Sequence, residues 1–317
     1  MVRFAETFDK LHSNVNRVVR GKPDVVRLAL CCLLSEGHLL IEDVPGTGKT
    51  TLAKAIAGSI GGSWRRVQFT PDLLPSDITG VMVFEPSTGR FSFREGPVYA
   101  NVVIGDEINR GSPKTQSAML EVMEERQVTT DGISRLVPRP FFVIATQNPQ
   151  DFQGTYPLPD VQLDRFAMRL SLGYVAPEVE LDLLMVDVVR RASPDVTPVV
   201  TLHDVVDMLS VVDNVHVGQG IGEYIVALAG ATRSQPALRL GASTRAVLSL
   251  LRLARAAAAT DGRDFVTPED VQLMIYPALT HRLALTPEAD LRGTTTHDVL
   301  AEVVDSLVVP RRRLERA

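Results

Sequence analysis

The stretch Ile41-Glu42-Asp43-Val44-Pro45-Gly46-Thr47-Gly48-Lys49-Thr50-Thr51 lies between a short apolar run and a segment with helical spacing. The apolar run, residues 39–41, predicts a short buried strand, and the residues from position 50 onward predict a helix. The loop between them has the Gly-Lys-Thr ending of a Walker A motif, in which backbone N–H groups at a helix N-terminus cradle phosphate oxygens. The stretch therefore predicts the strand, loop and helix of a P-loop nucleotide-binding protein.

Each position of this loop has an expected role. Gly46 and Gly48 let backbone N–H groups turn inward, Lys49 reaches the β- and γ-phosphates, and the Thr50 hydroxyl is expected to bind Mg²⁺. Asp43 replaces the first glycine of the full motif, and we expect it to serve because Asp also tolerates turn conformations. A glycine-rich turn with an exposed lysine is the simpler alternative. The residues expected to contact the nucleotide are Pro45, Gly46, Thr47, Gly48, Lys49, Thr50 and Thr51.

The composition is that of a globular protein with a moderate negative charge. The chain has 317 residues, a net charge of −5 and a pI near 5.7. This length allows two domains. The acidic balance weighs against a nucleic-acid partner, although a local basic patch would escape a count over the whole chain. The compact cluster Arg311-Arg312-Arg313 is interpreted as a solvated tail.

The cysteines and the N-terminus predict a cytoplasmic protein. Cys31 and Cys32 are adjacent in an apolar segment, so we expect reduced core residues rather than a disulfide bond. The Cys and His spacing typical of a zinc site does not occur. The N-terminal residues lack the apolar core of a signal peptide, and the apolar runs are too short to span a bilayer. Membrane insertion is therefore not expected.

A pair of acidic residues ends the apolar run of residues 101–105. This run predicts a strand buried on both faces, and acids at such a position call for an explanation. The interpretation is a Walker B pair, in which Asp106 holds Mg²⁺ through water and Glu107 polarises the attacking water. The alternative is a solvated strand end.

Two further segments are expected to complete the nucleotide site. A second buried strand, residues 141–145, leads into Thr146-Gln147-Asn148-Pro149. The Asn148 amide is expected to bind the γ-phosphate or the attacking water, the alternative being an asparagine that caps a turn. The backbone of residues 19–21, ending at Gly21, is expected to line an adenine pocket.

The remaining patterns divide the chain into two parts. Residues 1–173 contain the strands, with a first hairpin at about 76–100 that interrupts a helix and a second hairpin at about 127–138. The second is predicted from Asp131-Gly132, a strong hairpin signal. Residues 174–317 have helical spacing throughout. We therefore expect an α/β nucleotide-binding domain followed by an all-α lid.

The order of these features resembles the MoxR family of AAA+ ATPases over nearly the whole chain. Two stretches resemble MoxR in particular, Pro71-Asp72-Leu73-Leu74-Pro75-Ser76-Asp77-Ile78-Thr79-Gly80 and Ala145-Thr146-Gln147-Asn148-Pro149. Asp106-Glu107-Ile108-Asn109-Arg110 and Leu163-Asp164-Arg165-Phe166 also match. The resemblance implies an α/β AAA+ core with a parallel five-stranded sheet in the order 5-1-4-3-2, an all-α lid, and ATP with Mg²⁺ as cofactors. It also implies a homo-oligomeric ring, usually a hexamer, whose two hairpins face the substrate.

The resemblance assigns roles to two arginines. Arg165 falls at the arginine-finger position, acting on the ATP of the neighbouring subunit. Arg245, in Gly241-Ala242-Ser243-Thr244-Arg245, falls at the sensor 2 position, reaching the γ-phosphate within its own subunit; the family more often has Pro where Thr244 stands. The alternatives are an ion pair of Arg165 with Asp160 or Asp164, and a helix-capping role for Arg245.

The function implied by the resemblance is that of an ATP-hydrolysing chaperone. Such a protein would remodel or mature a protein client, with a von Willebrand factor A-domain protein as partner in trans. A nucleotide-gated scaffold with little turnover is an alternative, against which Glu107 argues. A DNA-associated AAA+ motor is another, against which the acidic balance argues. A small-molecule kinase would leave the helical C-terminal part and Arg165 unexplained.

Overall fold

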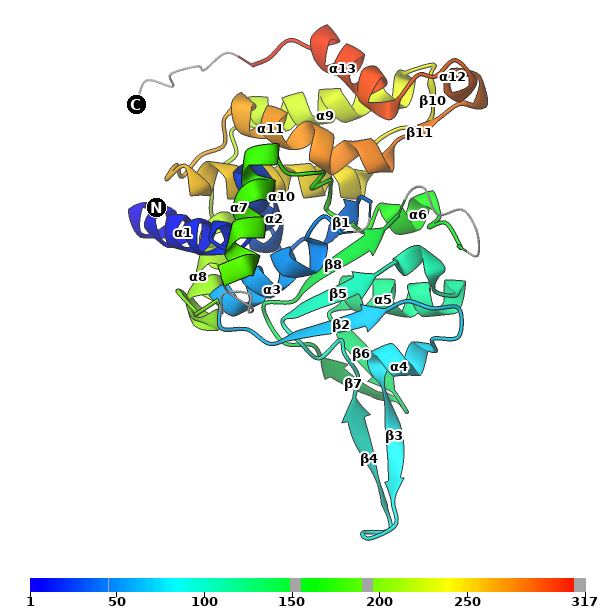
Figure 1. Ribbon diagram of the computed structural model, residues 1–317. Coiled ribbons are helices and arrows are strands. Elements are labelled where there is room, and N and C mark those ends of the chain that lie inside the picture. The colour runs from blue at the N-terminus through cyan, green and yellow to red at the C-terminus, as the bar shows by residue number, and fades with distance from the viewer. Residues whose placement is uncertain (45, 149–154, 190–195, 311–317) are drawn as a thin grey trace.

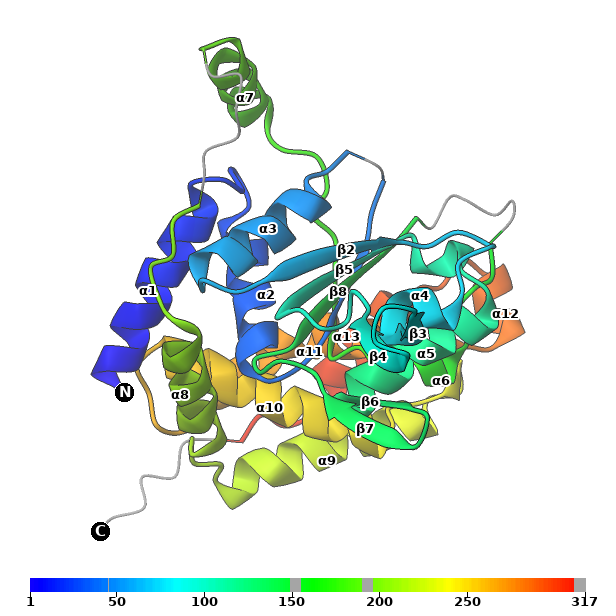
Figure 2. The same cartoon turned by 90° about the horizontal axis from the view of Figure 1, so that it is seen from below.

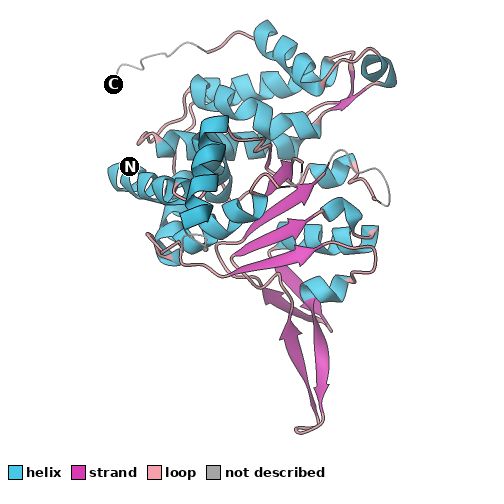
Figure 3. Cartoon of the chain, in the orientation of Figure 1, coloured by secondary structure: helices cyan, strands magenta, loops and turns pink. Residues whose placement is uncertain are grey.

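The computed structural model describes residues 1–44, 46–148, 155–189 and 196–310, without the side chains of 186–189 (Figure 1). The roles predicted for Pro45 and for the Arg311-Arg312-Arg313 tail lie outside the described residues. Within them, helices enclose a central sheet, and one hairpin projects far from the rest of the chain (Figures 1 and 3).

Five parallel strands form the central sheet. They lie in the order β2-β5-β8-β1-β9. Numbered along the chain as sheet strands alone, this order reads 2-3-4-1-5, which confirms the predicted order 5-1-4-3-2. Parallel strands place all their carboxyl ends on one edge of the sheet, and ligands of open α/β sheets bind at that edge. The strands are β1 (Leu39–Glu42), β2 (Trp64–Gln68), β5 (Val102–Asp106), β8 (Phe142–Gln147) and β9 (Met168–Leu170).

Alternate residues of each central strand enter two different cores, as the two-residue period of a strand requires. Leu39 and Ile41 of β1 belong to the core beneath α1, α2 and α3, whereas Leu40 between them belongs to the core beneath α5. Both faces are therefore covered, which explains the continuous apolar runs. Figure 2 shows α3 and α5 on different sides of the sheet. The helices are α1 (Val2–Asn16), α2 (Pro23–Leu34), α3 (Lys49–Ser59) and α5 (Pro113–Glu125).

Both predicted hairpins are present. β3 (Gly80–Glu85) pairs with β4 (Arg90–Glu95), and β6 (Gln127–Thr130) pairs with β7 (Ile133–Leu136). Asp131 and Gly132 both have positive φ, +52° and +75°, as a type I′ turn requires. One detail was wrong: α4 (Pro75–Thr79) precedes the first hairpin, but only a turn follows β4, because the chain enters β5 within a few residues.

The C-terminal part is helical except for one small antiparallel pair, β10 (Leu238–Leu240) with β11 (Ala284–Leu285). The predicted helical lid is present, and this short pair is a local addition to it. The connection to this part includes α6 (Asp160–Leu163), and a short 3₁₀ turn, η1 (Ile108–Arg110), follows β5. The C-terminal elements are α7 (Pro177–Val189), α8 (Leu202–Asp213), α9 (Gln219–Ser234), α10 (Thr244–Thr260), α11 (Pro268–Leu279), η2 (Thr280–Arg282), α12 (Pro287–Leu291) and α13 (Thr296–Ser306).

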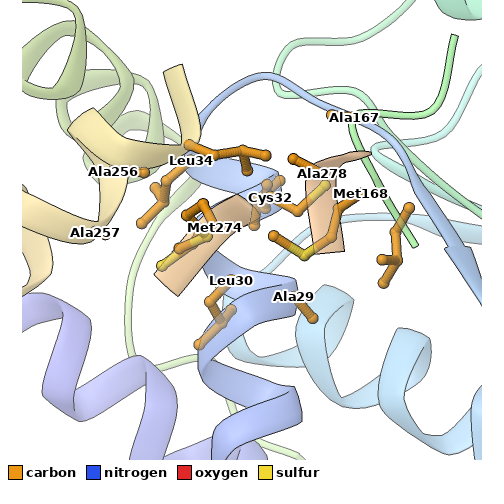
Figure 4. Packing of buried hydrophobic residues seen from close by; sticks show 14 of the residues in the cluster. Ala29, Leu30, Cys32, Leu34, Ala167, Met168, Ala256, Ala257, Met274 and Ala278 are labelled. Atoms are coloured by element: carbon orange, nitrogen blue, oxygen red, sulfur yellow. The ribbon is translucent and has the colours of Figure 1, made fainter. Parts of the chain in front are cut away.

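One core joins the C-terminal helices to the N-terminal ones. Leu30 and Cys32 of α2 pack beside Ala256 of α10 and Met274 of α11 (Figure 4). The two cysteines are fully buried and unpaired, as expected. The packing does not separate at the predicted boundary between residues 173 and 174, and that boundary stays a prediction. In the described part of the chain, no helix is both long and apolar enough to cross a bilayer.

Candidate active site

The predicted phosphate loop connects the carboxyl end of β1 to the first turn of α3. Gly46 and Gly48 have φ of +85° and +92°, a region that side chains with a Cβ rarely adopt. A Cβ added at either position would meet no atom within 4 Å, so the glycines are required by backbone conformation rather than by space. α3 begins at Lys49, directly after Gly48. The backbone therefore has the form that a P-loop needs.

The Lys49 side chain lies among the other predicted site residues. Its Nζ donates to the carbonyl oxygens of Asp43 and Val44 at 2.8 and 3.0 Å. Partial burial lowers the pKa of Lys49, and the nearby carboxylates of Asp43, Asp106 and Glu107 oppose that shift. The fold has thus brought the lysine of one strand end beside the acids of another.

Asp43 has a different role from the one expected. Its φ is not positive, so it does not replace a glycine by tolerating a turn. Its buried carboxylate instead accepts backbone N–H groups from Val44 (2.9 Å), Leu172 (2.8 Å) and Gly173 (2.7 Å). Asp43 therefore ties the phosphate loop to the segment that leads into α7. The only sequence signal for this role was an acid at the position of the first glycine of the motif.

Asp106 and Glu107 end the buried strand β5, as predicted. The Thr146 hydroxyl donates to Asp106 Oδ1 at 3.1 Å and accepts the Glu107 N–H at 3.0 Å. Glu107 has a φ of +54°. This left-handed backbone is uncommon for glutamate. The two adjacent acids are therefore both tied to Thr146 of β8, Asp106 through its side chain and Glu107 through its backbone.

Residues on the neighbouring strand β2 hold both acids, and the sequence analysis missed them. Arg66 Nε donates to Asp106 Oδ2 at 2.6 Å. Gln68 Nε2 donates to Glu107 Oε2 at 2.9 Å, and Arg110 lies 3.2 Å from the same oxygen. Arg66 and Gln68 are two positions apart and so share a face of the strand. That spacing was visible in the sequence, but the pairing of β2 with β5 was needed to give it meaning.

Asn148 and Gly21 also lie near this edge. Asn148 follows β8, which pairs with both β1 and β5. Gly21 has a φ of +73°, and a Cβ placed there would lie 3.1 Å from the Val179 side chain of α7. Lys22 next to it donates to the Tyr174 carbonyl oxygen at 2.7 Å. The γ-phosphate role of Asn148 and the adenine role of Gly21 stay predictions.

Arg165 and Arg245 lie elsewhere, and they lie together. The guanidinium groups of both form ion pairs with one carboxylate, that of Glu124 near the end of α5. Arg126, two residues after Glu124, donates to the carbonyl oxygens of Phe141 before β8 and Glu36 before β1. The cluster is therefore at the amino edge of the sheet, whereas the phosphate loop is at the carboxyl edge.

This location corrects the expected placement of Arg245. The four residues of β1 separate the two edges by about 13 Å, at a rise of about 3.3 Å per residue. In this structure Arg245 does not lie beside the phosphate loop of its own chain and lies with the predicted finger instead. The anticipated ion-pair alternative for Arg165 named Asp160 and Asp164, but the partner is Glu124. No motif indicated Glu124, because a glutamate on a helix is ordinarily a solvated residue.

Comparison with known proteins now gives the family. The ATPase family associated with various cellular activities (AAA) matches residues 38–168, and the AAA lid domain matches residues 230–303. Chaperone MoxR1 of Mycobacterium tuberculosis is 37% identical over 314 residues, which cover 96% of this chain and 83% of MoxR1. The chain belongs to the MoxR family of AAA+ ATPases.

Other MoxR-like chains extend the agreement. YeaC of Bacillus subtilis, an uncharacterized protein, is 45% identical over 304 residues, covering 96% of this chain and 95% of YeaC. A solved structure of a proposed ATPase from Cytophaga hutchinsonii is 34% identical, with a TM-score of 0.91 over 98% of this chain and 97% of its own. The MoxR resemblance, the AAA+ fold and the nucleotide-binding class are thereby confirmed.

Proposed function

We propose that this MoxR protein is an ATP-hydrolysing chaperone whose active sites form between subunits. The observation that supports this most is the separation of the two functional edges. Lys49, Asp106 and Glu107 lie at the carboxyl edge of the sheet, and Arg165 and Arg245 lie at the amino edge. A head-to-tail contact in which the amino edge of one subunit faces the carboxyl edge of the next combines the two sets. Such contacts are heterologous, and they form a ring when the rotation between neighbouring subunits closes.

The residues present fit Mg²⁺. Mg²⁺ in ATPase sites is bound by oxygen ligands, usually one or two carboxylates together with phosphates of the substrate. Asp106 supplies a carboxylate and Thr50 supplies a hydroxyl oxygen. The Asp106 carboxylate already contacts one cation, the guanidinium group of Arg66. No cluster of three ligating residues occurs in the described ranges, and this mode of binding needs none. When bound, the ion would neutralise charge on the phosphates.

Hydrolysis would divide the work between two chains. Lys49 and the loop N–H groups bind the phosphates, Glu107 orients and polarises the attacking water, and Asn148 contacts the γ-phosphate. Arg165 and Arg245 of the neighbouring subunit then stabilise charge on the transferred group. Arginine suits this role because its planar, permanently charged fork matches phosphate oxygens. Hydrolysis therefore depends on assembly.

The client-facing part of the proposal rests on the first hairpin. Phe84 and Phe91 near its tip are 51% and 66% exposed, with ring centroids 5.3 Å apart. Exposed aromatic side chains of this kind are suited to contact a protein. We propose a protein client, a von Willebrand factor A-domain partner in trans, a hexameric ring and a cytoplasmic location. A low-turnover scaffold is disfavoured by Glu107, and a DNA-associated motor by the net charge of −5.

Mixing two inactive variants tests the composite site. Lys49→Ala removes the phosphate-binding edge and Arg165→Ala removes the arginine edge, so each alone should be nearly inactive as an ATPase. An equal mixture should recover roughly a quarter of wild-type turnover, because one interface in four of a random heterologous ring combines two intact edges. A mixture as inactive as its components would overturn the shared site.

A trapping experiment tests the chaperone reading. Glu107→Gln should bind ATP without hydrolysing it and so hold its client, which affinity purification and mass spectrometry would then identify. The matched control is the same variant carrying Lys49→Ala, which should capture neither ATP nor client. Recovery of nucleic acid instead of protein would favour the motor. Unimpaired client binding by the control would favour a function independent of nucleotide.

A further inference from the structure

One carboxylate holds both arginines of the amino edge. Glu124 Oε2 lies 3.3 Å from Arg165 Nε, and Oε1 pairs with Arg245 Nη2. The Arg165 contact is electrostatic, since its Nε makes no hydrogen bond. The three side chains are partly exposed, at 36%, 28% and 41% for Glu124, Arg165 and Arg245. The arrangement is thus accessible to an incoming group.

A second carboxylate fixes the backbones that carry these arginines. The hydroxyl of Ser243, the N-cap of α10, donates to the carboxylate of Asp164, next to Arg165, and lies 3.0 and 2.8 Å from its two oxygens. Buried Arg282 also lies 3.0 Å from Asp164 Oδ1 and donates to the Asp164 carbonyl oxygen at 3.0 Å. Arg245 follows Ser243 by two residues. The spacing of the two arginines is therefore set without Glu124.

The charge around Glu124 needs a counter-ion. A cavity of about 260 Å³ beside it is lined by four arginines, Arg126, Arg165, Arg245 and Arg252, against the two carboxylates of Glu36 and Glu124. Two guanidinium groups directed at one point repel each other unless an anion lies between them. The two oxygens of the Glu124 carboxylate occupy the position that two phosphate oxygens would take, one for each arginine.

We propose that Glu124 is a positioning residue that pairs with Arg165 and Arg245 in the free subunit and releases both arginines to the γ-phosphate of the neighbour's ATP. This inference rests on the proposed function. Solvent-exposed ion pairs are weak, whereas a phosphate offers more charge and a bidentate geometry, so the exchange favours the nucleotide. In the absence of ATP, Glu124 competes for the arginines and restrains assembly.

The test measures how ATPase activity depends on subunit concentration. Glu124→Gln keeps the shape of the side chain and removes its charge, so the concentration for half-maximal ATPase should fall by about threefold or more. The rate per subunit at saturating concentration should stay within about twofold, because the arginines themselves are intact. Sedimentation with a non-hydrolysable ATP analogue should show the same shift in assembly, and the melting temperature should not change.

Glu125→Gln is the matched control. It removes the same charge one residue further along the chain, and Glu125 makes no ion pair in the described part of the structure. Its assembly should match that of the wild type. This control separates the effect of the Glu124–arginine contacts from the effect of losing one negative charge in the same region. Glu124→Ala serves as a second variant and should shift assembly in the same direction.

Two outcomes overturn the inference. In the first, Glu124→Gln assembles at the wild-type concentration or above it. In the second, its rate at saturation collapses, which would give Glu124 a direct structural or catalytic role. Wild-type protein that neither binds ATP nor assembles would instead contradict the proposed function, so the two failures are distinguishable.

Discussion

The carboxyl and amino edges of the sheet differ in how their charged groups are held. At the carboxyl edge each charged group has its own partner. Arg66 contacts Asp106, Gln68 contacts Glu107, and two loop carbonyl oxygens accept hydrogen bonds from Lys49. At the amino edge a single carboxylate, Glu124, pairs with two arginines. In the proposed function, one edge carries the groups that bind ATP and activate water, and the other carries those that stabilise the transferred charge.

In the proposed function these edges are two complementary halves of one site, and within a single subunit the sheet keeps them apart. β1 lies between the phosphate loop and the segment before residue 38, and it is part of a packed sheet with both faces covered. A packed core does not deform to close such a distance. Association of subunits is the remaining way to join the halves. The proposed composite site follows from this geometry, and four measurements would break or sharpen the contrast between the edges.

Arg165→Ala should have the largest effect. A finger supplied in trans contributes roughly 10³- to 10⁵-fold in rate, or about 4 to 7 kcal/mol of barrier. The turnover of the assembled protein should therefore drop by about 10³-fold or more, with ATP affinity little changed because the carboxyl edge is intact. Steady-state ATPase kinetics and titration with a fluorescent ATP analogue measure the two quantities. Arg292→Ala, an exposed arginine of the C-terminal part, is the control; equal rates in both variants would remove Arg165 from the site.

Glu107→Gln should have the next largest effect, and on the other edge. Loss of general-base action costs about 10²- to 10⁴-fold in rate, whereas the neutral amide leaves nucleotide binding intact. Single-turnover hydrolysis, measured beside analogue binding, separates the two. Exposed Glu302 on α13 provides the control in Glu302→Gln. Hydrolysis persisting at the wild-type rate would assign the activation of the attacking water to another group.

The amino edge should also be the acid-sensitive one. Burial lowers the pKa of His38 and of His281 well below the usual value. The Val143 N–H donates to His38 Nδ1 at 3.0 Å, so His38 is neutral, and its Nε2 donates to the Met123 carbonyl oxygen. Below about pH 6.5 the unfolded chain binds protons that the folded chain does not. As the pH is lowered, the free energy of unfolding therefore falls, with a slope that approaches about 1.4 kcal/mol per pH unit for each histidine.

Denaturant unfolding at several pH values between 7.5 and 5.5 measures this slope. His38→Gln should reduce the pH dependence of the free energy of unfolding, whether or not it changes the stability at pH 7.5. His203→Gln, a change at an exposed histidine, should leave that pH dependence as it is. An unchanged slope in His38→Gln would show that His38 does not stay neutral in the fold.

Arg66→Ala should have the smallest effect. The Arg66 guanidinium contacts the same Asp106 carboxylate that we expect to serve Mg²⁺, at 2.6 Å, and it is 51% exposed. Removing a partly exposed competitor should lower the Mg²⁺ concentration needed for tight analogue binding by about two- to fivefold. Fluorescence titration at fixed nucleotide and variable Mg²⁺ measures this, with Arg65→Ala on the same strand as control. A higher Mg²⁺ requirement would instead make Arg66 a support for the Asp106 carboxylate.

Local sequence patterns predicted the residues of the carboxyl edge because these residues come from short contiguous segments. Gly46, Gly48 and Lys49 are constrained by the backbone of one loop, and Asp106 with Glu107 follows a strand that could be read from its apolar run. The MoxR resemblance supplied the strand order. Arg66 and Gln68 were missed because a local pattern can predict a strand but does not show which strand pairs with it in the sheet.

The sequence by itself determined the phosphate loop, the acids of β5, both hairpins and the helical C-terminal part, because each depends on spacing within a short segment. Only the tertiary structure decided where the arginines lie. Arg245 and Arg165 are 80 positions apart, and Glu124 reaches both because α5, α6 and α10 meet at the amino edge. Contacts between such distant segments depend on how the whole core packs. The same packing places Arg245 beside Arg165 and Glu124 instead of beside the phosphate loop of its own chain.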